Sequence, residues 1–116
     1  MHELSIVEAL IDQVAQELDR AGQKGRVLQL EVSIGRLSGV NPDSVRFAFG
    51  LLTPGTVLDR AEILIEEPKP VCHCHVCDAR VEIDDLVIEC PQCHADAITI
   101  EGGRDMLLQS IEIEES

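Results

Sequence analysis

Apolar residues near the start of the chain recur at the spacing of an α-helix. They stand at Leu4, Val7, Ile11, Val14 and Leu18, with mostly polar residues between them. Steps of three and four residues bring such positions onto one face of a helix, which can then pack against a core. The pattern predicts an amphipathic helix over residues 5–20 that ends near Gly22.

Three later segments alternate apolar and polar residues, as half-buried strands do. They cover residues 28–34, 61–66 and 111–114. The last strand needs a sheet to join, and the first two strands provide one. We therefore expect an α+β fold with a small sheet of about three strands and two helices.

The second helix is predicted between the first two strands, after a loop over residues 35–40. Asn41 is a favourable N-cap, and Pro42 suits the first helical turn. The residues expected on its inner face are Val45, Ala48, Phe49 and Leu52. The sequence Thr53-Pro54-Gly55 ends this helix.

Two prolines in the stretch Glu67-Pro68-Lys69-Pro70 interrupt the strand pattern and indicate a domain boundary. We expect a core of residues 1–68 that is completed by a C-terminal strand over residues 104–116. Residues 69–103 then form a separate lobe, inserted between two strands of the core.

The net charge of −13, from 9 basic and 22 acidic residues, argues against a nucleic-acid partner and against an anionic membrane surface. The inserted lobe has only three basic residues against seven acidic ones over residues 69–104, so it carries no basic stripe either. No signal peptide is recognisable, and no apolar run approaches the roughly 20 residues that span a bilayer. We expect a cytoplasmic protein.

The inserted lobe contains two CxxC motifs, Cys74–Cys77 and Cys90–Cys93. Paired motifs of this kind are typical of a structural zinc site with four thiolate ligands. Short apolar segments at residues 81–83, 87–88 and 98–100 predict strands around the motifs, as in a zinc ribbon. A segment this small buries little apolar surface, and structural zinc supplies on the order of 10 kcal/mol or more towards its folding.

Other uses of the four cysteines fit less well. A rubredoxin-type iron site has the same spacing but is accompanied by aromatic residues, which this chain nearly lacks. Four thiolates leave no open position for catalysis by zinc, and a thioredoxin-type redox centre needs only one CxxC motif. Four further donors lie close by: Cys72, His73, His75 and His94. They are either surface or supporting residues, or one of them exchanges onto zinc or helps to bind a second metal.

A different kind of metal site is possible at the amino terminus, where His2 follows Met1. The terminal amine, the His2 amide and imidazole, and the next amide at Glu3 can lie close together. Nitrogen donors at such short separations favour square-planar Ni(II) or Cu(II). The alternative is that His2 is a solvated terminal residue and that Glu3 only adds a favourable charge to a helix N-terminus.

The ordered set of motifs resembles the HypA/HybF family of nickel metallochaperones for hydrogenase. The resemblance rests on Met1-His2-Glu3-Leu4-Ser5, Ile34-Gly35-Arg36-Leu37-Ser38, the two CxxC motifs and the closing Ile111-Glu112-Ile113, and it covers essentially the full length. It implies that His2 binds nickel through its imidazole, with backbone nitrogens of His2 and Glu3. It also implies that Cys74, Cys77, Cys90 and Cys93 bind zinc.

The resemblance further implies a non-enzymatic protein with two partners, a HypB-type GTPase and the precursor of the nickel–iron hydrogenase large subunit. Some relatives also serve urease maturation. The rival hypothesis is a zinc-ribbon interaction module that binds no second metal, in which His2 is incidental.

Overall fold

The computed structural model describes residues 3–114, so His2 lies outside the described residues. The chain divides into two compact units, which are treated separately below. The first, called the helical unit, comprises the residues up to Val32, Val40–Ile65 and the residues from Leu107 onwards. The second, called the cysteine unit, comprises Ser33–Gly39 and Glu66–Met106.

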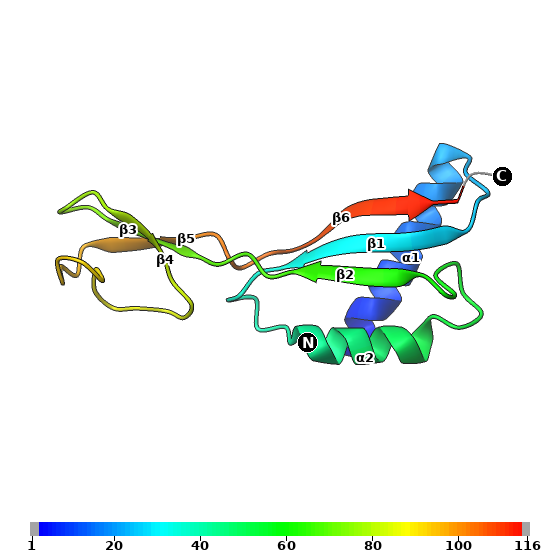
Figure 1. The fold of residues 1–116 in the computed structure, drawn as a ribbon, viewed down its shortest axis with the longest axis horizontal. Coiled ribbons are helices and arrows are strands. Elements are labelled where there is room, and N and C mark those ends of the chain that lie inside the picture. Colours follow the sequence, from blue (N-terminus) through cyan, green and yellow to red (C-terminus); the bar gives the residue numbers. More distant parts are fainter. Residues whose placement is uncertain (1–2, 115–116) are drawn as a thin grey trace. The chain divides into compact units, whose positions relative to one another are not determined.

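The helical unit is built on a three-stranded sheet in the order β2-β1-β6. The strands are β1 (Val27–Ile34), β2 (Glu62–Glu66) and β6 (Met106–Ile113). Figure 1 shows β2 and β6 pointing in opposite directions on either side of β1. This arrangement confirms the predicted α+β class and the joining of the last strand to the first two.

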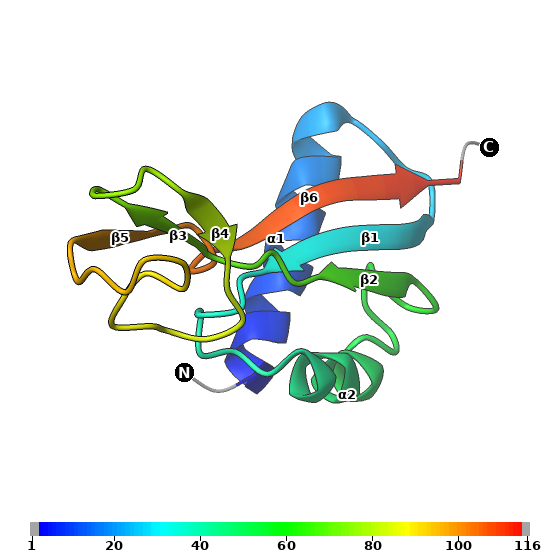
Figure 2. The same ribbon diagram turned by 60° about the vertical axis from the view of Figure 1, so that its left-hand side comes forward.

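Helix α1 (Glu3–Ala21) runs along one face of this sheet in both views (Figures 1 and 2). Its buried residues are Ile6, Val7, Leu10, Val14 and Leu18. The predicted stripe was wrong at two positions, since Leu4 is 46% exposed and Ile11 is only partly buried. Helix α1 also contacts α2 (Pro42–Leu52), so its buried face is displaced from the stripe that spacing alone suggested.

Helix α2 begins as the sequence predicts. The Asn41 side-chain oxygen accepts hydrogen bonds from the N–H groups of Asp43 at 2.9 Å and Ser44 at 3.2 Å. These N–H groups have no acceptor within the helix, so the cap satisfies them. At the other end, the Thr53 hydroxyl donates to the Phe49 carbonyl at 2.7 Å.

The cysteine unit contains a second three-stranded sheet in the order β4-β3-β5. Its strands are β3 (Val71–Cys74), β4 (Arg80–Glu82) and β5 (Ile98–Glu101), and β3 pairs antiparallel with both neighbours. The sequence did not predict β3, because its cysteines and histidines obscure the apolar pattern of a strand. The strand predicted at residues 87–88 was wrong, since this stretch is irregular and Ile88 is 90% exposed.

Residues 33–39, which the sequence grouped with the first domain, belong to the cysteine unit. Three backbone hydrogen bonds attach them: Gly35 N–H to Asp105 O at 2.8 Å, Leu37 N–H to Gly103 O at 2.6 Å, and Arg36 N–H to Pro68 O at 3.1 Å. Gly35 is required here, because a Cβ atom at this position would collide with the Gly103 carbonyl.

Within the described residues 3–114, neither helix combines the length and the apolar character needed to cross a membrane.

Candidate metal centre

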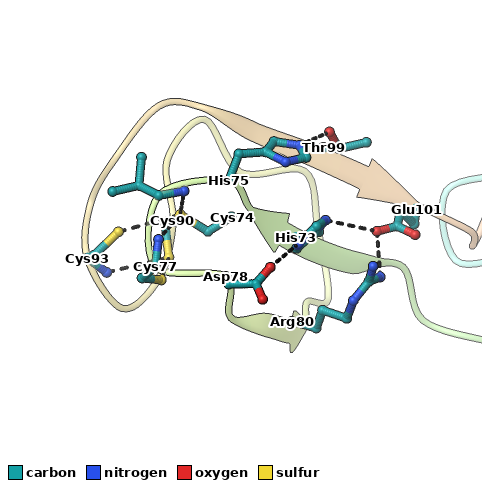
Figure 3. Close-up of polar contacts among 11 residues, drawn as sticks. His73, Cys74, His75, Cys77, Asp78, Arg80, Cys90, Cys93, Thr99 and Glu101 are labelled. Atoms are coloured by element: carbon teal, nitrogen blue, oxygen red, sulfur yellow. Dashed lines mark hydrogen bonds and ion pairs between the residues drawn. The ribbon is translucent and has the colours of Figure 1, made fainter.

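The four cysteines of the two CxxC motifs converge in the cysteine unit. The Sγ atoms of Cys74, Cys77, Cys90 and Cys93 all lie within 4.8 Å of one another. The shortest separations join Cys74 to Cys93 at 3.5 Å and Cys77 to Cys90 at 3.7 Å, so each contact links the two motifs (Figure 3). All five cysteines of the chain are free thiols.

The backbone of each motif turns its N–H groups towards the first sulfur. Cys74 Sγ accepts from the N–H groups of Val76 at 3.4 Å and Cys77 at 3.5 Å. Cys90 Sγ accepts in the same way from Gln92 and Cys93, both at 3.4 Å. Two segments 16 residues apart thus adopt the same local geometry, which stabilises negative charge on the first sulfur of each pair.

These hydrogen bonds divide the four thiols into two kinds. The N–H groups of Cys77 and Val76 lower the pKa of Cys74 to about 6, and those of Cys93 and Gln92 lower the pKa of Cys90. The Ala79 N–H acts to lower the pKa of Cys77, but loss of hydration and the neighbouring thiols raise it to about 12. The pKa of Cys93 is raised as well, with the Ala95 N–H opposed by Cys74 and by loss of hydration.

The donor set fits zinc. Four thiolates that converge from two motifs match the tetrahedral sulfur ligation that Zn²⁺ accepts, and they complete its coordination without an open position. Cys74 and Cys90 are buried, whereas Cys77 and Cys93 are exposed. When bound, the ion would cross-link the two motifs and would not take part in catalysis.

Cys72 is not part of this group of four. It lies on β3 between the partner positions Val81 and Ile100 and is buried. Burial raises the pKa of its thiol, and the neighbouring Cys90 and Cys74 add to the effect. The group of four sulfurs therefore contains Cys74 and Cys77 and leaves Cys72 outside.

His73 on β3 lies on the opposite face from Cys72 and Cys74, because successive residues of a strand point to opposite sides, and His75 follows the end of the strand. His73 Nε2 lies 2.9 Å from Asp78 Oδ1, and His75 Nε2 lies 2.6 Å from Thr99 Oγ1 (Figure 3). The hydrogen bond from His73 lowers the pKa of Asp78. His94 is separate from this pair; its Nδ1 lies 3.6 Å from Glu89 Oε1 at the surface. The sequence identified all three histidines as possible donors but did not predict their partners. Thr99, for example, is 24 residues from His75.

A family model described as "Hydrogenase/urease nickel incorporation, metallochaperone, hypA" matches residues 1–113. The chain belongs to the HypA family. This membership confirms the family resemblance and the nickel-metallochaperone function in hydrogenase maturation that the sequence motifs implied.

Curated relatives in the HypA family cover nearly the whole chain. The hydrogenase maturation factor HypA of Chlorobium limicola is 38% identical over 115 residues, which is 99% of this chain and 98% of the relative. The HypA of Aquifex aeolicus is 37% identical over 98% of both proteins.

Two solved HypA structures share the fold. The solution structure of the Ni metallochaperone HypA from Helicobacter pylori has a TM-score of 0.64 at 24% identity and covers 97% of both chains. A second structure, titled as the solution structure of HypA protein, has a TM-score of 0.68 at 25% identity and covers 98% of this chain and 97% of its own.

The amino-terminal part of the HypA motif is described only from Glu3 onwards. Glu3 is the first residue of α1 and is half-buried. Beside it lies a hollow of about 490 Å³, lined by Leu4, Phe47 and Leu51 among others. The N–H of the first helical residue has no acceptor within the helix, so the Glu3 amide is not used by the hydrogen bonds of α1.

Proposed function

We propose that this chain binds Ni(II) at its amino terminus and delivers it during the maturation of nickel–iron hydrogenase. The imidazole of His2 and the backbone nitrogens of His2 and Glu3 hold the ion. The observation that carries the proposal is the HypA match over residues 1–113, which includes the terminal motif. The start of α1 at Glu3 supports it, because it leaves that amide nitrogen without a helical partner.

Zinc has a structural role in this proposal. Cys74, Cys77, Cys90 and Cys93 hold Zn(II), and the helical unit that carries the nickel site is distinct from the cysteine unit that binds zinc. The closed set of four sulfurs supports a structural ion, since a catalytic zinc keeps one position for water or substrate. The protein is therefore a carrier and not an enzyme.

Two proteins act with the carrier. A HypB-type GTPase helps to load or release the nickel, and the precursor of the hydrogenase large subunit receives it. The family description also names urease, so urease maturation factors are a second possible destination. These steps take place in the cytoplasm, where the free thiols of the chain stay reduced.

Nickel titration of the zinc-loaded chain, with a free amino terminus, tests the terminal site. His2→Ala is expected to lose the tight Ni(II) ion while keeping its zinc. His94→Ala is the matched control, because it removes an exposed imidazole elsewhere and should keep that ion. If the tight ion persists in His2→Ala, the proposal fails and the chain is better described as a zinc-ribbon interaction module.

A further inference from the structure

The hollow between α1 and α2 in the helical unit is lined by exposed apolar side chains. Its volume is about 490 Å³, and its lining includes Glu3, Leu4, Asp43, Phe47, Ala48 and Leu51. Phe47 is 71% exposed, Leu51 59% and Leu4 46%. The start of α1 lies beside α2 in both ribbon views (Figures 1 and 2), so the two helices form the two sides of the hollow.

The core of the helical unit does not account for these apolar residues of α2. Asp43, Phe47 and Leu51 are four residues apart, so they share one face of the helix. The face that packs against the core is a different one, formed by Val45, Ala48 and Phe49. The chain has only two aromatic residues, and one of them, Phe47, stands in the exposed row. Exposed apolar patches mark interaction sites, and Phe is enriched in protein interfaces.

The charges around the apolar residues are mainly negative. Glu3 lines the hollow, and Glu8 follows Leu4 by one turn of α1. Among residues 3–114, neither of these two carboxylates has an ion-pair partner. Asp43 pairs with Arg46 at 2.8 Å, the one basic residue of α2. Such a rim attracts lysine or arginine, and it disfavours a second copy of a chain whose net charge is −13.

We propose that this hollow docks an amphipathic helix of a partner protein, with an apolar face that is flanked by lysine or arginine. A groove of this kind commonly takes the apolar side chains of one helix face. Glu3 directly follows His2 in the chain, so a partner bound here reaches the residue next to the proposed nickel ligand. The inference deepens the proposed function and rests on it for its purpose, because the docked partner is the one that gives or takes the ion.

The probe is a synthetic peptide of about four helical turns, in which leucines form one face and lysines flank it. Added to the isotope-labelled, zinc-loaded chain without nickel, it is expected to shift the amide signals of Leu4, Phe47 and Leu51. Phe47→Ala should raise the Kd of the peptide at least about tenfold. Leu107→Ala is the matched control, because it shortens a 54% exposed leucine of the same unit outside the hollow and should leave the Kd unchanged.

A second peptide, with glutamate in place of every lysine, tests the charge of the rim. It is expected to bind at least about tenfold more weakly at low salt. Docking is overturned if the lysine peptide does not bind, if Phe47→Ala and Leu107→Ala change its Kd equally, or if both peptides bind alike. It is also overturned if, without peptide, the signals around the hollow shift with the concentration of the chain, because a second copy then covers it.

Nickel titration of the same proteins separates this inference from the proposed function. Phe47→Ala should bind Ni(II) as the unaltered chain does, and His2→Ala should bind the lysine peptide as the unaltered chain does. Nickel binding that is unchanged in His2→Ala overturns the terminal nickel site alone. Peptide binding that is unchanged in Phe47→Ala overturns the docking surface alone.

Discussion

At the scale of single residues, the two cysteines of each CxxC motif have different surroundings. The first of each pair accepts two backbone N–H groups and is buried, and its pKa is lowered. The second is exposed, and its pKa is raised by the thiols around it and by loss of hydration. The folded lobe therefore favours the thiolate at the first cysteine of each motif and the protonated thiol at the second.

These surroundings exist only in the folded lobe, and the lobe is not expected to keep its fold without the ion. At pH 7, binding of Zn²⁺ to the metal-free chain is therefore expected to release nearly four protons, because thiols of an unfolded chain have a pKa of about 8.5 and zinc binds only thiolates. The affinity for zinc should fall steeply as the pH falls, since every thiolate ligand must then displace a proton.

Calorimetric titration in buffers of different ionisation enthalpy measures the number of protons released. A release of clearly fewer than four protons at pH 7 would show that the metal-free lobe keeps its fold and that its N–H groups already hold a thiolate. The same titration of the Cys72→Ala variant serves as the control and should give the same number, because Cys72 is not one of the four.

Asn41 provides a second residue-scale prediction. Asn41→Ala is expected to lower the free energy of unfolding by about 1 kcal/mol, because two N–H groups at the start of α2 lose their acceptor. Asn41→Ser keeps a capping oxygen and should lose much less. Denaturant unfolding of the zinc-loaded proteins gives the comparison, and equal losses in both variants would contradict the capping role.

The cap and the two CxxC motifs could be predicted because each depends on residues close together in the sequence. The partners of His73 and His75 could not. Thr99 lies next to His75 only because β5 pairs with β3. The register of this pairing cannot be predicted from either segment alone. Sequence reasoning therefore identified the donors and left their surroundings open.

At the scale of elements, one continuous segment contributes to both units. Most of β1 belongs to the sheet of the helical unit, and the loop after it belongs to the cysteine unit. The loop forms three backbone hydrogen bonds within the cysteine unit, and Gly35 approaches the Gly103 carbonyl too closely for any side chain. The resemblance singled out residues 34–38 as a motif, and this contact gives that motif a physical reason.

Gly35→Ala is expected to destabilise the cysteine unit by roughly 1–3 kcal/mol, because the added methyl group must push two backbone segments apart. Gly50→Ala, at an exposed position of α2 where a Cβ atom meets nothing, is the control and should be neutral or stabilising. Hydrogen exchange of the Leu37 N–H reports the effect locally. Unchanged protection of that amide in Gly35→Ala would refute the prediction.

The elements that sequence analysis missed share a cause. Strand β3 was not predicted, because it is short and consists largely of cysteine and histidine. In β6, the alternation of apolar and polar residues was recognisable only near the end, since Met106–Ser110 lacks a clean alternation. Conversely, the apolar residues at 87–88 suggested a strand that is not there. In so small a unit, metal ligation takes over part of the role of apolar burial, so apolar runs lose predictive value.

At the scale of the whole molecule, the two units have cores of different composition. The core of the helical unit is aliphatic, from residues such as Val7, Val14 and Leu30. That of the cysteine unit consists largely of Cys72, Cys74 and Cys90 with few aliphatic residues. Composition predicts a boundary near Pro68, but it does not reveal that residues 33–39 belong to the cysteine unit, because that grouping depends on hydrogen bonds between distant segments.

Removal of zinc is therefore expected to affect the two units unequally. A strong chelator should abolish the dispersed amide signals of residues 71–101 while the signals of α1 and most of its helical circular dichroism persist. Renewed addition of zinc should restore the spectrum. Simultaneous loss of both sets of signals would mean that the helical unit cannot fold without the metal.

The insertion of the cysteine unit ahead of β6 has a consequence for the nascent chain. Domains generally form during synthesis once their residues have emerged from the ribosome. Every residue of the cysteine unit precedes Leu107, whereas the sheet of the helical unit needs β6, which follows the cysteine unit in the sequence. The four thiols can thus acquire their ion while the sheet of the helical unit still lacks a strand.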